Sequence, residues 1–169
     1  GGRLFYVGAG TSGRLGVLDA AECPPTFCTP PELVQGILAG GAAALVKSSE
    51  ALEDRPEDGA QAIRDRQITS LDVVVGITAG GTTPFVHGAL KEAKVRGATT
   101  VGMSCVSAEQ VPMEADIELR LLVGAEVLAG STRLKAGTVT KMALNIISTG
   151  AMARYGKVYG NRMVDVAVT

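Results

Sequence analysis

The chain has 169 residues, a formal net charge of −1 and a hydrophobic fraction of 46%, with 22 glycines and no tryptophan. That length predicts one domain, residues 1–169, which we expect to be an excerpt of a longer protein. A balanced charge without a basic stripe excludes a nucleic-acid partner, and no apolar run reaches the length of a membrane span. Three cysteines and one histidine without ligand spacing predict reduced thiols in the cytoplasm and no metal site.

The first predicted strand, Leu4–Val7, runs directly into a turn rich in glycine and hydroxyl groups. A helix-compatible stretch, Leu15–Glu22, follows at once. Such a turn can direct the backbone N–H groups of Gly10, Thr11 and Ser12, and two hydroxyls, at an anion near the start of a helix. The turn therefore predicts a phosphate-binding site, although it could serve only tight packing of strand against helix.

The spacing of Gly8, Gly10 and Gly13 also matches the G-x-G-x-x-G fingerprint of dinucleotide-binding domains. Those domains need an acidic residue at the end of the second strand to hold the ribose. The second predicted strand, Leu33–Leu38, ends in alanine and two glycines instead. A small phosphorylated ligand is therefore favoured over a dinucleotide.

Two groups of acidic residues are candidates for chemistry. Glu22 precedes Pro24 and Pro25, which are expected to end or turn the first helix, and a carboxyl at a helix end is suited to donating a proton. Glu50 and Glu53 are three residues apart and would share one face of a helix. From the residues alone, both groups are more typical of a solvated surface, and the charged segment 50–66 predicts exposed helix and loop.

The third predicted strand, Val73–Ile77, is followed by a second turn of the same kind. This turn contains Gly81, and Thr83 and Pro84 are a good N-cap and first residue for the next helix. If the strand order reverses between the first and third strands, their two turns border one crevice, where open α/β sheets bind ligands.

Two more predicted strands, Thr99–Ser104 and Ile117–Val123, complete an alternation of strands and helices. Continuous apolar strands are typical of a parallel sheet that is covered on both faces, so the fold class is α/β, a three-layer αβα sandwich with five parallel strands. A third polar cluster then precedes an apolar helix that Gly156 could end. Its candidate ligand-binding residues are Ser131, Thr132, Arg133 and Lys135. The two cations oppose the helix dipole there, which is favourable only if they share an anion.

Four long motifs carry a resemblance to a known family. They are GAGTSGRLGVLDAAECPPT at 8–26, DVVVGI at 72–77, GSTRLKAGT at 130–138 and GKVYGNRMVDV at 156–166. Together they resemble the N-acetylmuramic acid 6-phosphate etherases of the sugar isomerase (SIS) superfamily, which are related to the glucokinase regulatory protein. The resemblance extends over nearly the whole chain.

The resemblance implies a flavodoxin-like SIS domain that binds a phosphorylated amino sugar, forms a homodimer and uses no cofactor. It implies cleavage of the D-lactyl ether of N-acetylmuramic acid 6-phosphate to N-acetylglucosamine 6-phosphate and D-lactate, with Glu22 as acid and Glu53 as base. Phosphate and sugar would contact residues of the three polar turns and one further acid. These expected contacts are Gly10, Thr11, Ser12, Glu50, Gly81, Thr83, Ser131, Thr132, Arg133 and Lys135.

One turn departs from the family's pattern. The etherases usually have Ser-Gly-Arg-Thr-Pro after the third strand, whereas this chain has Gly80-Gly81-Thr82-Thr83-Pro84. A hydroxyl and a guanidinium are therefore replaced. Two alternatives to the etherase remain open: a non-catalytic regulator that binds a sugar phosphate, and an aldose–ketose isomerase of the same superfamily.

Overall fold

The computed structural model describes residues 1–47 and 50–165, and the side chain of Glu50 lies outside the described part. Five parallel strands form one sheet in the order β2-β1-β3-β4-β5, which confirms the predicted fold class. The fifth strand ends three residues earlier than expected. The strands are β1 (Leu4–Gly8), β2 (Val34–Leu38), β3 (Val73–Ile77), β4 (Thr99–Ser104) and β5 (Ile117–Arg120).

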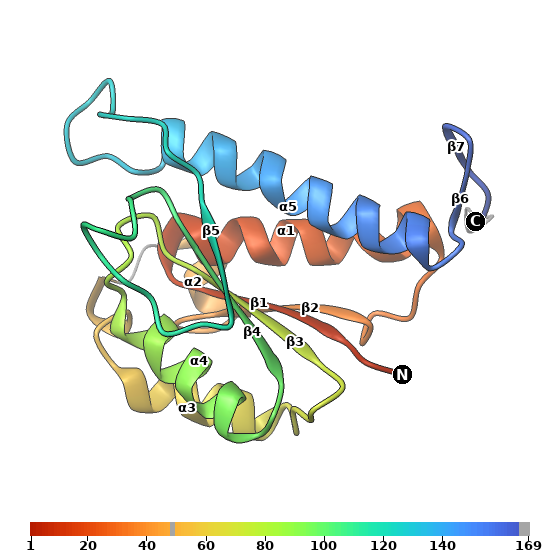
Figure 1. Ribbon diagram of the computed structural model, residues 1–169, viewed down its shortest axis with the longest axis horizontal. Coiled ribbons are helices and arrows are strands. Elements are labelled where there is room, and N and C mark those ends of the chain that lie inside the picture. The colour runs from red at the N-terminus through yellow and green to blue at the C-terminus, as the bar shows by residue number, and fades with distance from the viewer. Residues whose placement is uncertain (48–49, 166–169) are drawn as a thin grey trace.

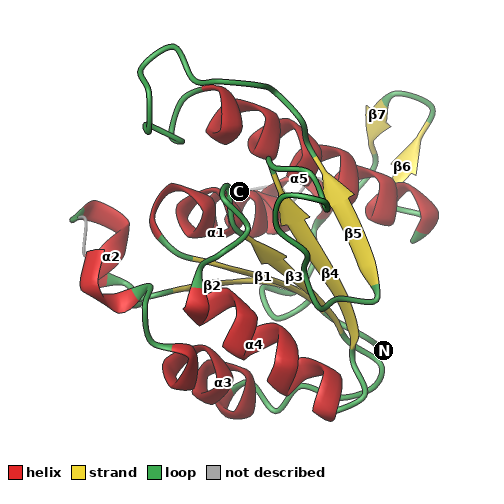
Figure 2. Cartoon of the chain, turned by 60° about the vertical axis from the view of Figure 1, so that its left-hand side comes forward, coloured by secondary structure: helices red, strands yellow, loops and turns green. Residues whose placement is uncertain are grey.

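Helices cover both faces of the sheet, as Figures 1 and 2 show. The long helices α1 (Gly10–Phe27) and α5 (Lys135–Arg154) lie on one face, and α3 (Pro56–Asp65) and α4 (Pro84–Val95) lie on the other. Within the described ranges, no helix is both long and apolar enough to cross a membrane. The smaller elements are α2 (Ala43–Val46), the 3₁₀ turn η1 (Glu50–Leu52) and the hairpin strands β6 (Val158–Tyr159) and β7 (Arg162–Met163).

The sheet has an apolar core on each side because successive strand residues point to opposite faces. Phe5 and Val74 are fully buried in the cluster beneath α3 and α4. Tyr6 and Val75, their neighbours in the chain, belong to the cluster beneath α1 and α5. The central strands are therefore apolar on both sides, which explains their continuous hydrophobic runs.

Helix α1 does not end at its two prolines, so that expectation was wrong. The helix continues through Pro24 and Pro25 to Phe27 and closes with a bond from the Cys28 N–H to the Pro24 carbonyl (2.9 Å). A proline lacks the N–H that an inner helical turn needs. Here the loss falls in the last turn, where the buried side chains of Cys23 and Phe27 still anchor the helix in the core.

The order of the strands brings the first and third strands together. β1 pairs with β2 on one side and with β3 on the other, so the chain reverses its direction across the sheet after β2. The carboxyl ends of β1 and β3 are thus neighbours, and the turns that follow them face each other. This is the position at which open α/β sheets bind ligands, as the sequence predicted.

Candidate functional site

The turn after β1 is shaped by close contact between two glycines. The Gly13 N–H donates to the carbonyl of Ala9 (3.1 Å), and a Cβ on Gly13 would lie 2.5 Å from the Gly8 carbonyl oxygen. Gly10 begins α1 with a φ of +52°, in the region that favours glycine. The backbone therefore turns tightly from strand to helix without a side chain in the way.

The N–H groups of Gly10, Thr11 and Ser12, and the hydroxyls of Thr11 and Ser12, have no partner in the part of the chain that the structure describes. No side chain caps α1, and no hydrogen bond involves the hydroxyls of Thr11 and Ser12 there. The first N–H groups of a helix have no acceptor within the helix itself. The turn therefore presents free N–H and hydroxyl donors at the positive end of a helix dipole, which suits an anion.

The turn after β3 is held by polar contacts of its own. The hydroxyls of Thr78 and Thr83 share a hydrogen bond of 2.8 Å, and the Gly81 N–H donates to the Thr78 carbonyl (3.2 Å). His87 Nε2 lies 2.7 Å from the Gly81 carbonyl oxygen, so this nitrogen carries the proton that is donated. Thr83 is the N-cap residue of α4 as expected, but its hydroxyl bonds to Thr78 instead of capping the helix.

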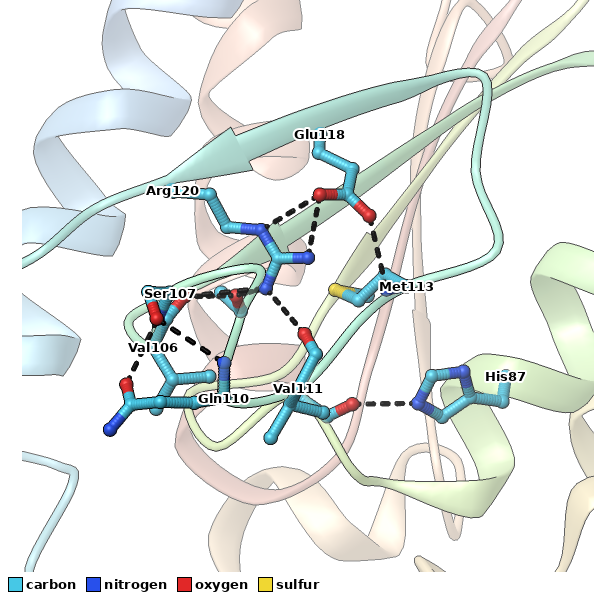
Figure 3. A network of polar contacts seen from close by, with 10 residues as sticks. His87, Val106, Ser107, Gln110, Val111, Met113, Glu118 and Arg120 are labelled. Atoms are coloured by element: carbon cyan, nitrogen blue, oxygen red, sulfur yellow. Dashed lines mark hydrogen bonds and ion pairs between the residues drawn. The ribbon is translucent and has the colours of Figure 1, made fainter.

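The loop after β4 packs against this second turn (Figure 3). Arg120 of β5 donates through Nη1 to Ser104 Oγ (2.8 Å) and to the carbonyl of Val111 (2.9 Å). Val106 and Val111 stand so close to Gly81 that a Cβ there would be 3.0 Å from Val111 and 3.3 Å from Val106. Arg120 thereby fixes the wall against which the turn packs.

A polar pocket of about 260 Å³ opens between the two turns. Glu53 is one of its lining residues, and the Glu53 carbonyl accepts the Phe85 N–H in the first turn of α4 (3.0 Å). Helices α3 and α4 can hold this segment in place because they meet closely: a Cβ on Gly59 would overlap the Phe85 carbonyl. The pocket is lined by Ala9, Gly10, Thr11, Ser12, Glu53, Thr78, Ala79, Gly80, Thr82, Thr83 and Thr132.

Six of the predicted site residues therefore come together, from four separate segments: Gly10, Thr11, Ser12, Glu53, Thr83 and Thr132. Gly81 belongs to the second turn but does not line the pocket, and the side chain of Glu50 lies outside the described part. Sequence reasoning missed Thr78 as a lining residue, although its position directly after β3 could have revealed it.

Glu22 lies far from this pocket within the same chain. It is exposed near the end of α1, twelve residues after Gly10, which corresponds to about 18 Å along the helix axis. The prolines do not end the helix at this point. Glu22 is therefore not at the helix end, contrary to the expectation from the sequence. One chain does not bring Glu22 and Glu53 together.

The N–H groups at the start of α5 bind a carboxylate of the chain itself, that of Glu126, which sequence reasoning missed. The carboxylate of Glu126 accepts the N–H groups of Lys135 (2.8 Å) and Ala136 (3.0 Å), and these bonds lower the pKa of Glu126. Lys135 extends its ammonium away to the carbonyl of Ala125 (3.0 Å). The position of Glu126, a few residues before the polar cluster, is the signal by which the sequence could have revealed this contact.

The other members of that cluster lie around the helix start. Ser131 is in a turn, where its N–H donates to the Leu128 carbonyl (3.0 Å). Thr132 lines the polar pocket, and Arg133 lines a second, neighbouring pocket. Among the described residues, no group of three or more His, Cys, Asp or Glu side chains could hold a metal ion.

Comparisons with known proteins agree with the fold. Residues 1–94 match a family model described as the glucokinase regulatory protein N-terminal SIS domain. A phosphoheptose isomerase from Francisella tularensis shares the fold, with a TM-score of 0.60 at 17% identity over 90% of this chain and 75% of that one.

The whole chain also aligns with curated proteins of high similarity. It is 78% identical to the N-acetylmuramic acid 6-phosphate etherase of Crocosphaera subtropica and 79% identical to that of Gloeothece citriformis. Each alignment covers 100% of this chain and 55% of the relative, so the chain spans about half the length of these proteins.

Proposed function

Because the chain belongs to the SIS family of the glucokinase regulatory protein N-terminal domain, and is 78% identical to etherases over its full length, we propose that its protein is an etherase. It would cleave the D-lactyl ether of N-acetylmuramic acid 6-phosphate to give N-acetylglucosamine 6-phosphate and D-lactate. A cytoplasmic location, a homodimer and a single SIS domain over residues 1–169 belong to the same proposal.

The observation that carries this proposal is the polar pocket between two helix starts, whose lining contains one acidic residue, Glu53. Phosphate would bind the free N–H groups and hydroxyls of Thr11 and Ser12, since two helix dipoles favour an anion there. The sugar would then extend toward Glu53. Thr83 would add a hydroxyl, provided that it exchanges its bond with Thr78 for one with the ligand.

The chemistry begins with the open-chain form of the sugar, whose aldehyde makes the proton on C2 acidic. Glu53 would remove this proton, and the resulting enolate would expel lactate as the C3–O bond breaks. An acid protonates the departing lactate, and water then adds to C3 while a proton returns to C2. Such proton transfers require one carboxylate and one carboxylic acid, held in different environments.

Glu22 fits the role of the acid only if it comes from a second copy of the chain. Within one chain it is about 18 Å along α1 from the first turn, too far to share a substrate with Glu53. We therefore propose that the homodimer brings Glu22 of one copy to the pocket of the other. Glu22 is exposed near the end of α1, as this arrangement requires.

The test is release of D-lactate by the full-length protein, beside Glu53→Gln and Glu22→Gln. Each variant should lose at least about a hundredfold in rate, because general acid–base groups contribute that much or more. Glu57→Gln, a change at another exposed acid in the first turn of α3, should keep the wild-type rate. An active Glu53→Gln variant would contradict the assigned base.

Mixing the two inactive variants tests whether the site is shared between copies. If Glu22 acts across the dimer, random exchange of subunits restores about a quarter of the wild-type activity, since half of the dimers then hold one intact site. If both residues act within one chain, the mixture stays inactive.

One observation favours a second candidate, a regulator that binds a sugar phosphate without cleaving it. The matching family model is that of a regulatory protein, and Gly80 and Thr82 replace the serine and arginine that etherases usually have. This candidate predicts no lactate release but a higher melting temperature with sugar phosphates.

A further inference from the structure

We propose that a second pocket, beside the polar one, binds the carboxylate of the substrate's lactyl group, with Lys141 as its specificity-determining cation. This inference rests on the proposed etherase function and deepens it. The second pocket has a volume of about 310 Å³ and lies between the starts of α1 and α5. The residues that line it include Thr11, Leu15, Arg133, Thr138, Lys141 and Met142.

The two pockets share a wall. Thr11 lines both of them, and the consecutive residues Thr132 and Arg133 line one each. The start of α5 packs against this wall: a Cβ on Gly137 would lie 3.4 Å from Thr11 Cγ2, and the Gly137 N–H donates to the Thr132 carbonyl (3.0 Å). A ligand seated in the polar pocket can therefore extend past Thr11 into the second one.

The charges of the two pockets differ. The polar pocket is lined by residues with hydroxyls, by the start of α1 and by one acidic residue, Glu53, and no lysine or arginine lines it. The second pocket holds two cations, Arg133 and Lys141, and neither forms an ion pair or a hydrogen bond with any described residue. Two cations that line one cavity and have no partner among the described residues are suited to a carboxylate.

The remaining surface of the second pocket fits the rest of a lactyl group. Leu15 and Met142 place apolar side chains beside the two cations. A D-lactyl ether consists of a carboxylate and a methyl group on one carbon, so it needs a cation and an apolar contact side by side. Lys141 and Met142 share a face of α5 with Thr138, since they follow it by three and four residues.

The proposal makes the second pocket a feature that distinguishes substrate from product sugar. N-acetylglucosamine 6-phosphate has the phosphate and the ring but no lactyl group, so it would fill the polar pocket alone. N-acetylmuramic acid 6-phosphate would fill both. Selectivity for the lactyl compound would then depend on Lys141, whereas affinity for the phosphate would not.

The experiment compares Lys141→Gln with the wild type in the full-length protein. Affinities are measured for both sugars in a Glu53→Gln background that blocks turnover, and kcat/KM for lactate release is measured without that change. Lys141→Gln should weaken binding of N-acetylmuramic acid 6-phosphate and lower kcat/KM about tenfold, the effect of losing one charged hydrogen bond. Binding of N-acetylglucosamine 6-phosphate should stay unchanged, and Lys141→Arg should restore selectivity.

The matched control is Lys91→Gln, which removes an exposed lysine from α4 on the opposite face of the sheet and should change neither affinity. Equal loss of both sugars in Lys141→Gln would show that the cations bind the phosphate, and would overturn the proposal. Unchanged binding of both would overturn it as well.

Failure of the etherase itself gives a different result. If the wild type releases no lactate, the two affinities still decide the matter. The proposal is supported if the wild type binds N-acetylmuramic acid 6-phosphate more tightly than N-acetylglucosamine 6-phosphate and Lys141→Gln abolishes this difference. Equal binding of the two sugars by the wild type would overturn the proposal.

Discussion

The two turns that border the polar pocket look alike in sequence but are held in different ways. The turn after β1 depends on the close approach of Gly8 and Gly13 and leaves the hydroxyls of Thr11 and Ser12 without partners in the described structure. The turn after β3 uses its hydroxyls internally, between Thr78 and Thr83. The first turn therefore leaves its donors free, whereas the second uses its donors to hold its own shape.

The largest effect should come from the glycine contact in the first turn. Gly13→Ala places a Cβ 2.5 Å from the Gly8 carbonyl oxygen, so the strand and helix must separate, and we expect a loss of about 3 kcal/mol in unfolding free energy. Urea unfolding measures this. Gly150→Ala is the control: nothing lies within 4 Å of its Cβ, and it should add up to about 1 kcal/mol of helix stability. A Gly13→Ala protein as stable as wild type would refute the glycine-built turn.

Removal of the second turn's support should have the next largest effect. Arg120→Met leaves Ser104 Oγ and the Val111 carbonyl without their donor, with an expected loss of about 2 kcal/mol in unfolding free energy. Hydrogen exchange should rise in the loop at 105–113. Arg96→Met, which breaks a surface ion pair with Glu92, should cost at most about 1 kcal/mol. Unchanged exchange in the loop would show that Arg120 does not hold it.

Asp72 lies at the opposite end of β3, so its loss should affect stability without changing the pocket. Burial would raise the pKa of Asp72, but hydrogen bonds from Arg3 and Thr69 outweigh it and lower that pKa to about 2. The carboxylate therefore stabilises the fold fully above about pH 4, and this stabilisation disappears as the pH falls toward 2.

Asp72→Asn should cost about 1.5 kcal/mol near pH 7 and flatten the acid limb of the stability curve. Melting curves from pH 7 to pH 2 measure both effects. Binding of N-acetylglucosamine 6-phosphate at pH 7 should equal that of the wild type. A weaker affinity would mean that the two ends of β3 are coupled.

The smallest expected changes in stability come from substitutions of the threonines, and they distinguish the two turns most clearly. Thr83→Val breaks the bond with Thr78 and should cost about 1 kcal/mol in the free protein. Thr11→Val breaks no bond in the described structure and should stay within about 0.5 kcal/mol of wild type, yet it should lose most of the melting-temperature shift caused by sugar phosphates. If Thr11→Val binds sugar phosphates normally, the first turn is not their donor.

The sheet and both turns could be predicted from the sequence because they depend on local patterns. Apolar runs such as Val73–Ile77 mark buried strands, and Thr83 with Pro84 marks the start of a helix. The end of α1 could not be predicted from its prolines, because burial of Phe27 against the sheet extends the helix past them.

The parts of the site that escaped prediction depend on contacts between distant segments. Glu126 caps α5 from a loop nine residues earlier, and Arg120 reaches the β4–β5 loop from another strand. Neither contact leaves a periodic signal in the sequence. Glu22 was paired with Glu53 on the resemblance alone, and only the length and direction of α1 reveal that one chain keeps them apart.

The contact between His87 and the Gly81 carbonyl gives this domain a built-in spectroscopic reporter. His87 is the only histidine among the 169 residues, and its Nε2 proton lies against the turn that borders the pocket. Its imidazole resonances are therefore free of overlap from other histidines of the chain. If a ligand is added stepwise, the NMR signals of this one ring would record when the turn moves, without any added label.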